Sequence, residues 1–192
     1  APMFKFLRKC PEKVHQALRN VTDTLKDYCT ALIEESGCHA IMFDTLYASQ
    51  TIMRASMWDE WEGPYIQELA ELVHSKDTMV MIHNCGDGIY FKEQIERMHP
   101  QAISTLFLPP DCKTMEECKE KYGDQITIIG SVPPSNIVTD TEEQIRAECR
   151  REMDAYKKNG GFILSTGCEY PAQLPDHYAR VIVEEARTYG KY

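Results

Sequence analysis

Three residues of this sequence are soft metal ligands that stand at the ends of apolar runs. His83 and Cys85 follow Val80-Met81-Ile82, and Cys168 follows the run from Phe162 to Gly167. Residues two apart on an extended backbone point the same way, so His83 and Cys85 can share a metal ion. Three protein ligands with one open position are typical of catalytic zinc sites, and thiolates favour zinc over magnesium or calcium. The pattern predicts an enzyme whose zinc is held by His83, Cys85 and Cys168.

The ligand types also limit the chemistry of such a centre. Two thiolates make a bound zinc ion electron-rich, so it would activate water weakly and suit a substrate thiol that must stay deprotonated at neutral pH. Asp44 directly follows the apolar run Ile41-Met42-Phe43 and is our candidate catalytic residue. A fourth metal ligand, a partner of a ligand, a substrate contact and a loop cap are all open as its role. Glu169 is a weaker candidate for the same roles.

The elements that must position these residues alternate along the chain. Short apolar runs, typical of strands covered on both faces, occupy residues 38–43, 78–82, 102–106, 126–130 and 161–165. Helical patterns occupy residues 11–36, 59–76, 88–98, 114–122, 140–158 and 175–188, and we expect Thr139 or Asp140 to cap the fifth of them. Strands alternating with helices predict an α/β fold with a parallel sheet.

Two parallel architectures fit this alternation, an open doubly wound sheet and a (β/α)8 barrel. Reactive or special residues follow four of the five runs, which is the barrel pattern. A barrel takes about 250 residues, whereas this chain has 192. We therefore predict a single domain over residues 1–192 that forms the C-terminal portion of a TIM barrel and lacks its N-terminal strands. Because five strands leave open edges, we expect a homo-oligomer, a swapped segment or the missing N-terminal segment to cover them.

Composition limits the partners and the compartment. The net charge of -9 argues against nucleic acid and anionic membranes as partners. We find no run of about 18 apolar residues and no signal-peptide apolar region, so we expect a cytoplasmic protein. The chain starts without Met, which suggests a processed or engineered start.

The eight cysteines could form four disulfides in a secreted protein, but the long helical patterns favour free thiols, with Cys29 and Cys38 in the core.

The Met-rich and aromatic stretch between Tyr47 and Trp61 has two interpretations, a lid over the site or packing onto the next helix. We favour packing for Met53, Met57 and Trp61. His74 is interpreted as a structural histidine, as is His39.

These residues together resemble the uroporphyrinogen decarboxylase superfamily, and within it the zinc-dependent methylcobamide methyltransferases, whose best-known members act on coenzyme M. The resemblance runs from Pro11-Glu12-Lys13-Val14-His15 through residues 43–49 to the C-terminal helix. The segment 162–168 is similar to the superfamily's Ile-Leu-Ser-x-Gly-Cys segment, and Gly130-Ser131-Val132-Pro133-Pro134 resembles a variant of its Gly-Asn-x-Asp-Pro turn. The His-x-Cys-Gly and Gly-Cys segments are the methyltransferase ligands, whereas decarboxylation in this superfamily needs no metal.

The resemblance implies a methyltransferase that moves a methyl group between a corrinoid protein and a thiol or another small acceptor or donor. No Asp-x-His-x-x-Gly cobalamin-ligand motif is present in the sequence, so a separate carrier protein is expected to supply the corrinoid. One alternative is metal-free decarboxylation of a porphyrinogen, which would need clustered arginines where this sequence offers Arg54 and Arg97. The other is a non-catalytic zinc- or corrinoid-binding fragment. The methyl donor, the acceptor, the direction of transfer and activity without the N-terminal strands stay open.

Overall fold

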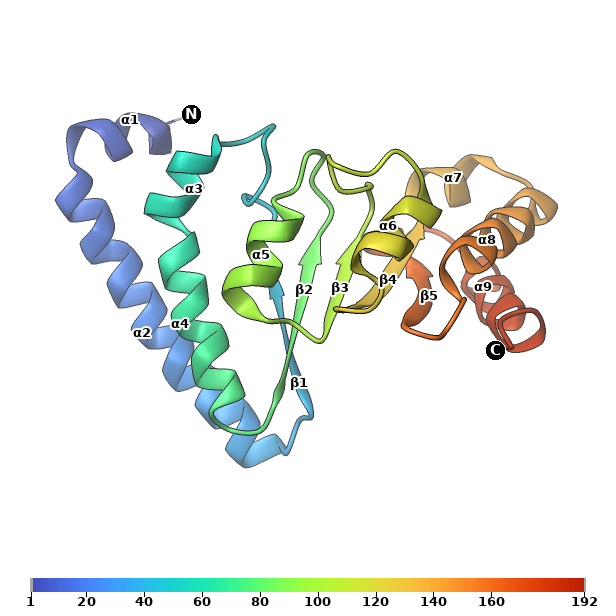
Figure 1. Cartoon of the computed structure of the whole chain (residues 1–192), viewed down its shortest axis with the longest axis horizontal. Coiled ribbons are helices and arrows are strands. Elements are labelled where there is room, and N and C mark those ends of the chain that lie inside the picture. The colour runs from blue at the N-terminus through green and yellow to red at the C-terminus, as the bar shows by residue number, and fades with distance from the viewer. Residues whose placement is uncertain (1, 192) are drawn as a thin grey trace.

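Five strands form one parallel sheet, and their order in the sheet is their order along the chain (Figure 1). The computed structural model describes residues 2–191. The strands are β1 (Ala40–Asp44), β2 (Met79–Asn84), β3 (Ala102–Thr105), β4 (Thr127–Val132) and β5 (Phe162–Thr166). Each parallel neighbour is reached through at least one helix, which confirms the predicted α/β class and a partial TIM-barrel-like fold.

Helices precede the first strand, follow every strand and close the described part of the chain. They are α1 (Pro2–Lys9), α2 (Pro11–Ser36), α3 (Ala55–Trp61), α4 (Gly63–His74), α5 (Phe91–Met98), α6 (Met115–Tyr122), α7 (Pro134–Thr139), α8 (Glu142–Tyr156) and α9 (Asp176–Thr188). The sequence did not predict α1 or α7. The helix expected over 59–76 is two helices that meet at Glu62, because Pro64 in the first turn of α4 has no amide hydrogen to continue α3.

The N-cap of α8 lies one to two residues beyond the predicted cap. Thr139 is the last residue of α7, so neither it nor Asp140 caps α8. Thr141 is the N-cap instead: its hydroxyl accepts from the Gln144 amide at 3.3 Å, and the Gln144 side chain accepts from the Thr141 amide at 2.8 Å. This reciprocal capping box satisfies two amide groups that would otherwise lack partners at the helix start.

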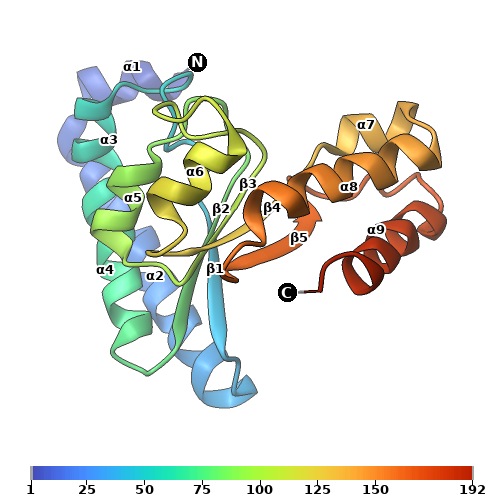
Figure 2. The same ribbon diagram turned by 45° about the vertical axis from the view of Figure 1, so that its right-hand side comes forward.

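The core lies between the helices and one face of the sheet. Val80, Ile82, Ile103 and Ile128 all point to this face and are fully buried. Figure 2 shows α5, α6 and α8 along the outer side of the curved sheet. Burial of alternate residues on one face is the largest stabilising contribution that the sheet makes.

The opposite face of the sheet is open, which corrects the expectation of strands covered on both faces. Met42 and Ile163 are each 50% exposed on this face, and Met79 is 44% exposed. The outer strands of the described sheet, β1 and β5, each have one neighbour. The apolar runs were misleading because in a barrel the inner face is covered by the opposite strands, which this chain does not supply.

Other expectations concern side chains away from the sheet ends. All eight cysteines lie within the described residues and are free thiols, with Cys29 buried in the core and Cys38 packed against it. Met53 and Trp61 are buried and Met57 is partly buried against the cluster that contains Met53, as expected of side chains that pack. His74 Nε2 lies 3.0 Å from the Met98 carbonyl, as expected of a structural histidine. Within residues 2–191, no helix is long and apolar enough to span a bilayer.

Candidate metal centre

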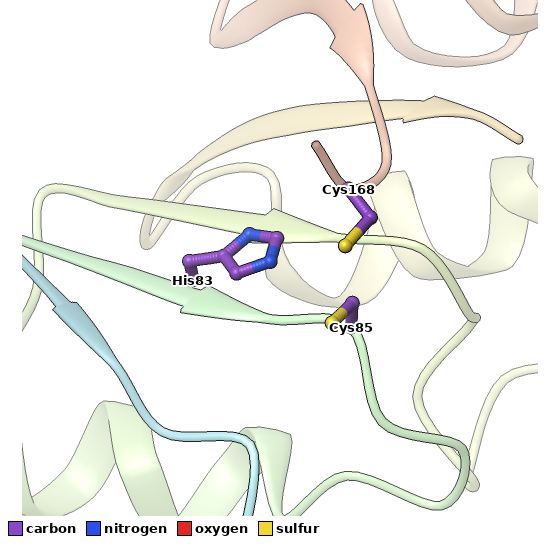
Figure 3. A group of neighbouring side chains, drawn as sticks. All are labelled: His83, Cys85 and Cys168. Carbon is purple, nitrogen blue, oxygen red and sulfur yellow. The ribbon is translucent and has the colours of Figure 1, made fainter. Parts of the chain in front are cut away.

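His83, Cys85 and Cys168 lie together at the carboxyl ends of β2 and β5. One ligand atom from each residue lies within 4.8 Å of the other two, and all three side chains are half-buried. Figure 3 shows the His83 ring and the two sulfur atoms turned toward one common space. The strands β3 and β4 separate β2 from β5 in the sheet, so the sheet's curvature brings their ends together. The structure thus assembles the three residues selected from the sequence, while their role as ligands stays a prediction.

The His83 ring is oriented by a residue that the sequence analysis did not select. Ser104 is the register partner of His83 on β3, and its Oγ lies 3.1 Å from His83 Nδ1. Metal-binding histidines usually use their second ring nitrogen for such a contact, which fixes the ring and its tautomer. Nε2 of His83 is then left for a metal. A polar residue inside an apolar strand was the available signal for Ser104.

The turn that carries Cys85 is built on the side chain of Asn84. Asn84 is fully buried, its Nδ2 donates to the Thr45 carbonyl at 2.8 Å, and its Oδ1 accepts from the Gly86 amide at 2.9 Å. Buried amides of this kind are costly unless they are hydrogen-bonded, so these contacts hold the chain in one conformation. Asn84 therefore fixes Cys85 from the face of β2 opposite His83.

The Cys168 loop is held by the strand next to it. The Gly167 amide donates to the Val132 carbonyl at 2.9 Å, and Thr166 Oγ1 donates to the Cys168 carbonyl at 2.6 Å. A Cβ atom on Gly167 would lie 2.8 Å from Leu106 Cα. Glycine is needed here because the loop passes so close to the backbone after β3.

Asp44 lies beside the cluster and has two roles in the described structure. It is in register with His83, and its Oδ1 accepts from the Leu46 amide at 3.2 Å, as a loop cap does. Asp44, His83 and Cys168 also line one pocket of about 420 Å³ on the open side of the sheet, together with Glu169. The loop-cap interpretation is thus correct for one oxygen, and the carboxylate still faces the cluster.

Without a bound cation, the electrostatics of the cluster keep the Cys85 thiol neutral. Burial first, and then the neighbouring Cys168 thiol and Asp44 carboxylate, raises the pKa of Cys85 to about 11. Each of these causes disfavours the thiolate form of Cys85, so without a counter-charge this thiol is neutral at pH 7. A divalent cation would remove this penalty, and a His-Cys-Cys donor set is one that zinc accepts.

Comparison with known proteins places this chain in a family. A family model described as "Uroporphyrinogen decarboxylase (URO-D)" matches residues 1–189. The chain belongs to the uroporphyrinogen decarboxylase family. Among curated members, the uroporphyrinogen decarboxylase of Prochlorococcus marinus (strain NATL1A) is 26% identical, over 92% of this chain and 48% of its own length. That of Aliarcobacter butzleri (strain RM4018) is 25% identical, over 97% of this chain and 52% of its own length.

A solved structure has the same fold as this family member. The "methyltransferase from Methanosarcina mazei" superposes with a TM-score of 0.76 at 19% identity, over 98% of this chain and 53% of that chain. At this identity the likeness shows the fold alone. The chain spans about half the length of the curated relatives and of the solved structure described above.

An acidic residue close to Asp44 was missed by the sequence analysis. Glu62 lies between α3 and α4, and burial, followed by the nearby Asp44 carboxylate, raises its pKa to about 7. A carboxyl group that titrates near neutral pH beside a candidate site is suited to proton transfer. Its position before Gly63-Pro64 gave no signal beyond that of a helix boundary.

Proposed function

We propose that this chain is part of a zinc-dependent methyltransferase that moves a methyl group between a corrinoid on a partner protein and a small thiol or other acceptor or donor. The observation that supports this proposal is the cluster of His83, Cys85 and Cys168, with Ser104 on the second ring nitrogen of His83. A metal-free decarboxylase has no use for such a donor set.

Zinc held by these three residues would keep a substrate thiol deprotonated at neutral pH. The residues of the chain would position the reacting sulfur and remove its proton. His83, Cys85 and Cys168 would fix the position of the reacting sulfur, and Asp44 with Glu62 would take the proton that the thiol loses. In the thiol-methylating direction, a sulfur–carbon bond forms, the cobalt–carbon bond breaks and its electron pair stays on cobalt.

The carboxyl ends of the strands are the proposed entrance for the carrier protein. The pocket lined by Asp44, His83 and Cys168 lies at this end of the sheet. A corrinoid is a large planar group, so a wide approach to the cluster suits it better than a closed cavity.

We also propose that further polypeptide covers the open face and the free strand edges around this entrance. We favour a segment equivalent to the half of the relatives that this chain does not match, because it would add the strands needed to close a barrel. A second copy of the chain is the other occupant that a solution experiment can detect.

The direct test is methyl transfer from methylcobalamin to a small thiol, followed by the loss of methylcobalamin absorbance. We expect turnover that requires zinc and that Cys168→Ser reduces by at least about 100-fold, corresponding to about 2.7 kcal/mol. Cys38→Ser is the matched control, because Cys38 is also a half-buried free thiol but lies outside the cluster. Equal turnover in Cys168→Ser and in Cys38→Ser would reject the proposal.

The second candidate function is porphyrinogen decarboxylation, which the names of both curated relatives favour. This activity would need arginines free to bind carboxylate groups. In the described part of the chain, Arg97 instead donates to Asp59 at 2.9 Å and lies over the Trp58 ring. Carbon dioxide release from uroporphyrinogen that is unchanged by Cys168→Ser and by zinc removal would support this function over methyl transfer.

A further inference from the structure

Glu152 is a fully buried carboxyl group in the middle of α8, behind the end of β4. Its side chain is 0% exposed, and its Oε2 accepts a hydrogen bond from the Ser131 amide on β4. Its Oε1 is buried and has no hydrogen-bond partner among the residues that the structure describes. An ionised carboxylate with one oxygen left unpaired is costly to bury, so the site favours the neutral acid.

The charges around Glu152 act in the same direction. Burial is the largest cause, and the Glu148 carboxylate adds to it, so the pKa of Glu152 rises to about 8 although the Ser131 amide and Arg151 oppose the rise. On the same helix, Cys149 and Tyr156 also face this carboxyl group.

The elements packed on α8 bring little positive charge to this point. Cys118 of α6 contacts Tyr156, and Glu185 of α9 acts on Cys149. Neither supplies a cation that could pair with an ionised Glu152. The neutral acid is therefore the stable form at pH 7 in the described structure.

The end of β4 connects Glu152 to the candidate metal centre. Ser131 and Val132 pair in register with Ser165 and Thr166 of β5. The Val132 carbonyl accepts from the Gly167 amide at 2.9 Å, and Cys168 is the next residue. A Cβ on Gly167 would lie 3.0 Å from the Ser131 carbonyl oxygen, so the Cys168 loop rests directly on Ser131, which Glu152 holds, and on the adjoining Val132.

We propose that Glu152 is a positioning residue for the metal centre: it holds the Ser131 amide and thereby sets the place of the Cys168 loop. This inference rests on the proposed metal binding by His83, Cys85 and Cys168. The carboxyl group touches neither substrate nor metal, and it acts through the backbone of β4. A neutral side chain that accepts one hydrogen bond should perform the same task. The Ser131 amide would bind an ionised carboxylate more strongly, but burial and the Glu148 carboxylate disfavour that charge, so ionisation should draw the side chain toward water and away from Ser131.

The test compares Glu152→Gln, Glu152→Ala and the control Met153→Ala, with Co²⁺ or Zn²⁺ affinity measured by chelator competition on the full chain. We expect Glu152→Ala to weaken metal binding by about 10- to 100-fold, the usual effect of removing a residue that orients a metal ligand. Glu152→Gln keeps the acceptor and should bind as the native chain does at pH 7. Met153 is also buried in α8, but its sulfur faces the end of α9 near Gly190, so its loss should destabilise the fold without weakening metal binding.

The pH dependence separates positioning from general stability. Between pH 7 and 9 the native carboxyl group ionises and Glu152→Gln does not, so the native chain should lose affinity relative to Glu152→Gln by at least about 3-fold. This comparison needs no alanine variant, so it tests the positioning role of Glu152 even if Glu152→Ala does not fold. A constant ratio across this range, or native affinity in a folded Glu152→Ala, overturns the inference alone. If the native chain binds no metal, both the inference about Glu152 and the proposed function are wrong.

Discussion

At the scale of residues, the candidate metal centre depends on groups that are not ligands. Ser104 orients the His83 ring, Asn84 holds the turn before Cys85, and Gly167 lets the Cys168 loop pass close to Leu106. A metal site that is held to within a fraction of an ångström needs such support. The affinity of the centre should therefore respond to changes that leave all three ligands in place.

Gly167→Ala is the sharpest of these changes. The added Cβ would lie 2.7 Å from Leu106 Cδ1 and 2.8 Å from Leu106 Cα, so the loop must move and take Cys168 with it. We expect metal affinity to fall by about 10-fold or more, measured by chelator competition. Gly123→Ala is the control, because its Cβ would meet the Lys119 carbonyl at 2.5 Å at the end of α6. Equal metal affinity in the two variants would show that the loop's place does not matter.

Glu62 should make the stability of the fold depend on pH. Its folded pKa is raised to about 7 from an ordinary value of 4.5, so the folded state keeps a proton that the unfolded state releases. Stability from this group therefore falls as the pH rises from 4.5 to 7. Glu62→Gln should remove that fall, seen as a smaller change in urea midpoint between pH 5 and pH 7.5. Glu60 is an exposed neighbour, so Glu60→Gln should show the same change in urea midpoint as the native chain. If Glu62→Gln also shows the native change, the raised pKa of Glu62 is not the cause.

At the scale of elements, the last two helices are joined by a charged contact. Glu185 of α9 is buried and accepts from Arg150 at 2.7 Å and from Arg146 at 2.9 Å, both on α8. This contact ties α9 to the helix that carries Glu152. It therefore supports the outer layer behind the Cys168 loop.

Glu185→Gln should loosen this contact in a pH-dependent manner. Hydrogen bonding to Arg150, and then to Arg146, lowers the pKa of Glu185 against the effect of burial. The stability from this carboxylate is present above its ordinary pKa of 4.5 and is lost as the pH falls below it. The melting temperature of Glu185→Gln should be below that of the native chain at pH 7, with a smaller gap at pH 3.5. Glu184→Gln, which removes an exposed partner of Arg146, should cost less at pH 7; an equal cost would contradict this account.

The elements that followed from the sequence are those with a strong local signal. The five strands were found as apolar runs, and α2 begins and ends as its pattern predicts, at Pro11 and Ser36. The break at Glu62 was missed because a continuous apolar period outweighed the turn residues. The cap at Thr141 was missed because Thr139, Asp140 and Thr141 are all of capping type. The open face was missed because an apolar run does not tell which neighbour covers it.

For the candidate site, the sequence predicted the three candidate ligands but not the residues that support them. Residue type, together with position at the ends of apolar runs, selected His83, Cys85 and Cys168, since few other side chains bind zinc. Ser104, Glu62 and the other supporting residues depend on strand register and helix packing, which lie beyond local sequence.

At the scale of the whole molecule, the metal centre lies on an uncovered surface. The open sheet face exposes Met42 and Ile163, and α2, which precedes the edge strand β1, exposes Val21, Leu25 and Tyr28 along one side. Spacings of four and three residues place these last three on one helical stripe. Exposed apolar groups of this kind are what the proposed covering polypeptide would bury.

We expect the chain on its own to associate as its concentration rises, measured by light scattering after gel filtration. Leu25→Lys should weaken this association, because it puts a charge into the apolar stripe of α2. Lys13→Glu, a charge change outside that stripe on the same helix, should not. A monodisperse monomer whose β1 and β5 amides are strongly protected from hydrogen exchange would contradict the proposal of an uncovered face.

Metal analysis of the purified chain tests the central claim most directly. We predict about one zinc ion per chain for the native sequence and for Cys38→Ser, and a loss of at least about 10-fold in zinc content for Cys85→Ser and for Cys168→Ser. The three cysteines are all half-buried free thiols, so only membership of the cluster distinguishes the variants. Zinc content that is unchanged in Cys85→Ser and Cys168→Ser would contradict the assignment of the metal centre and the methyl transfer that depends on it.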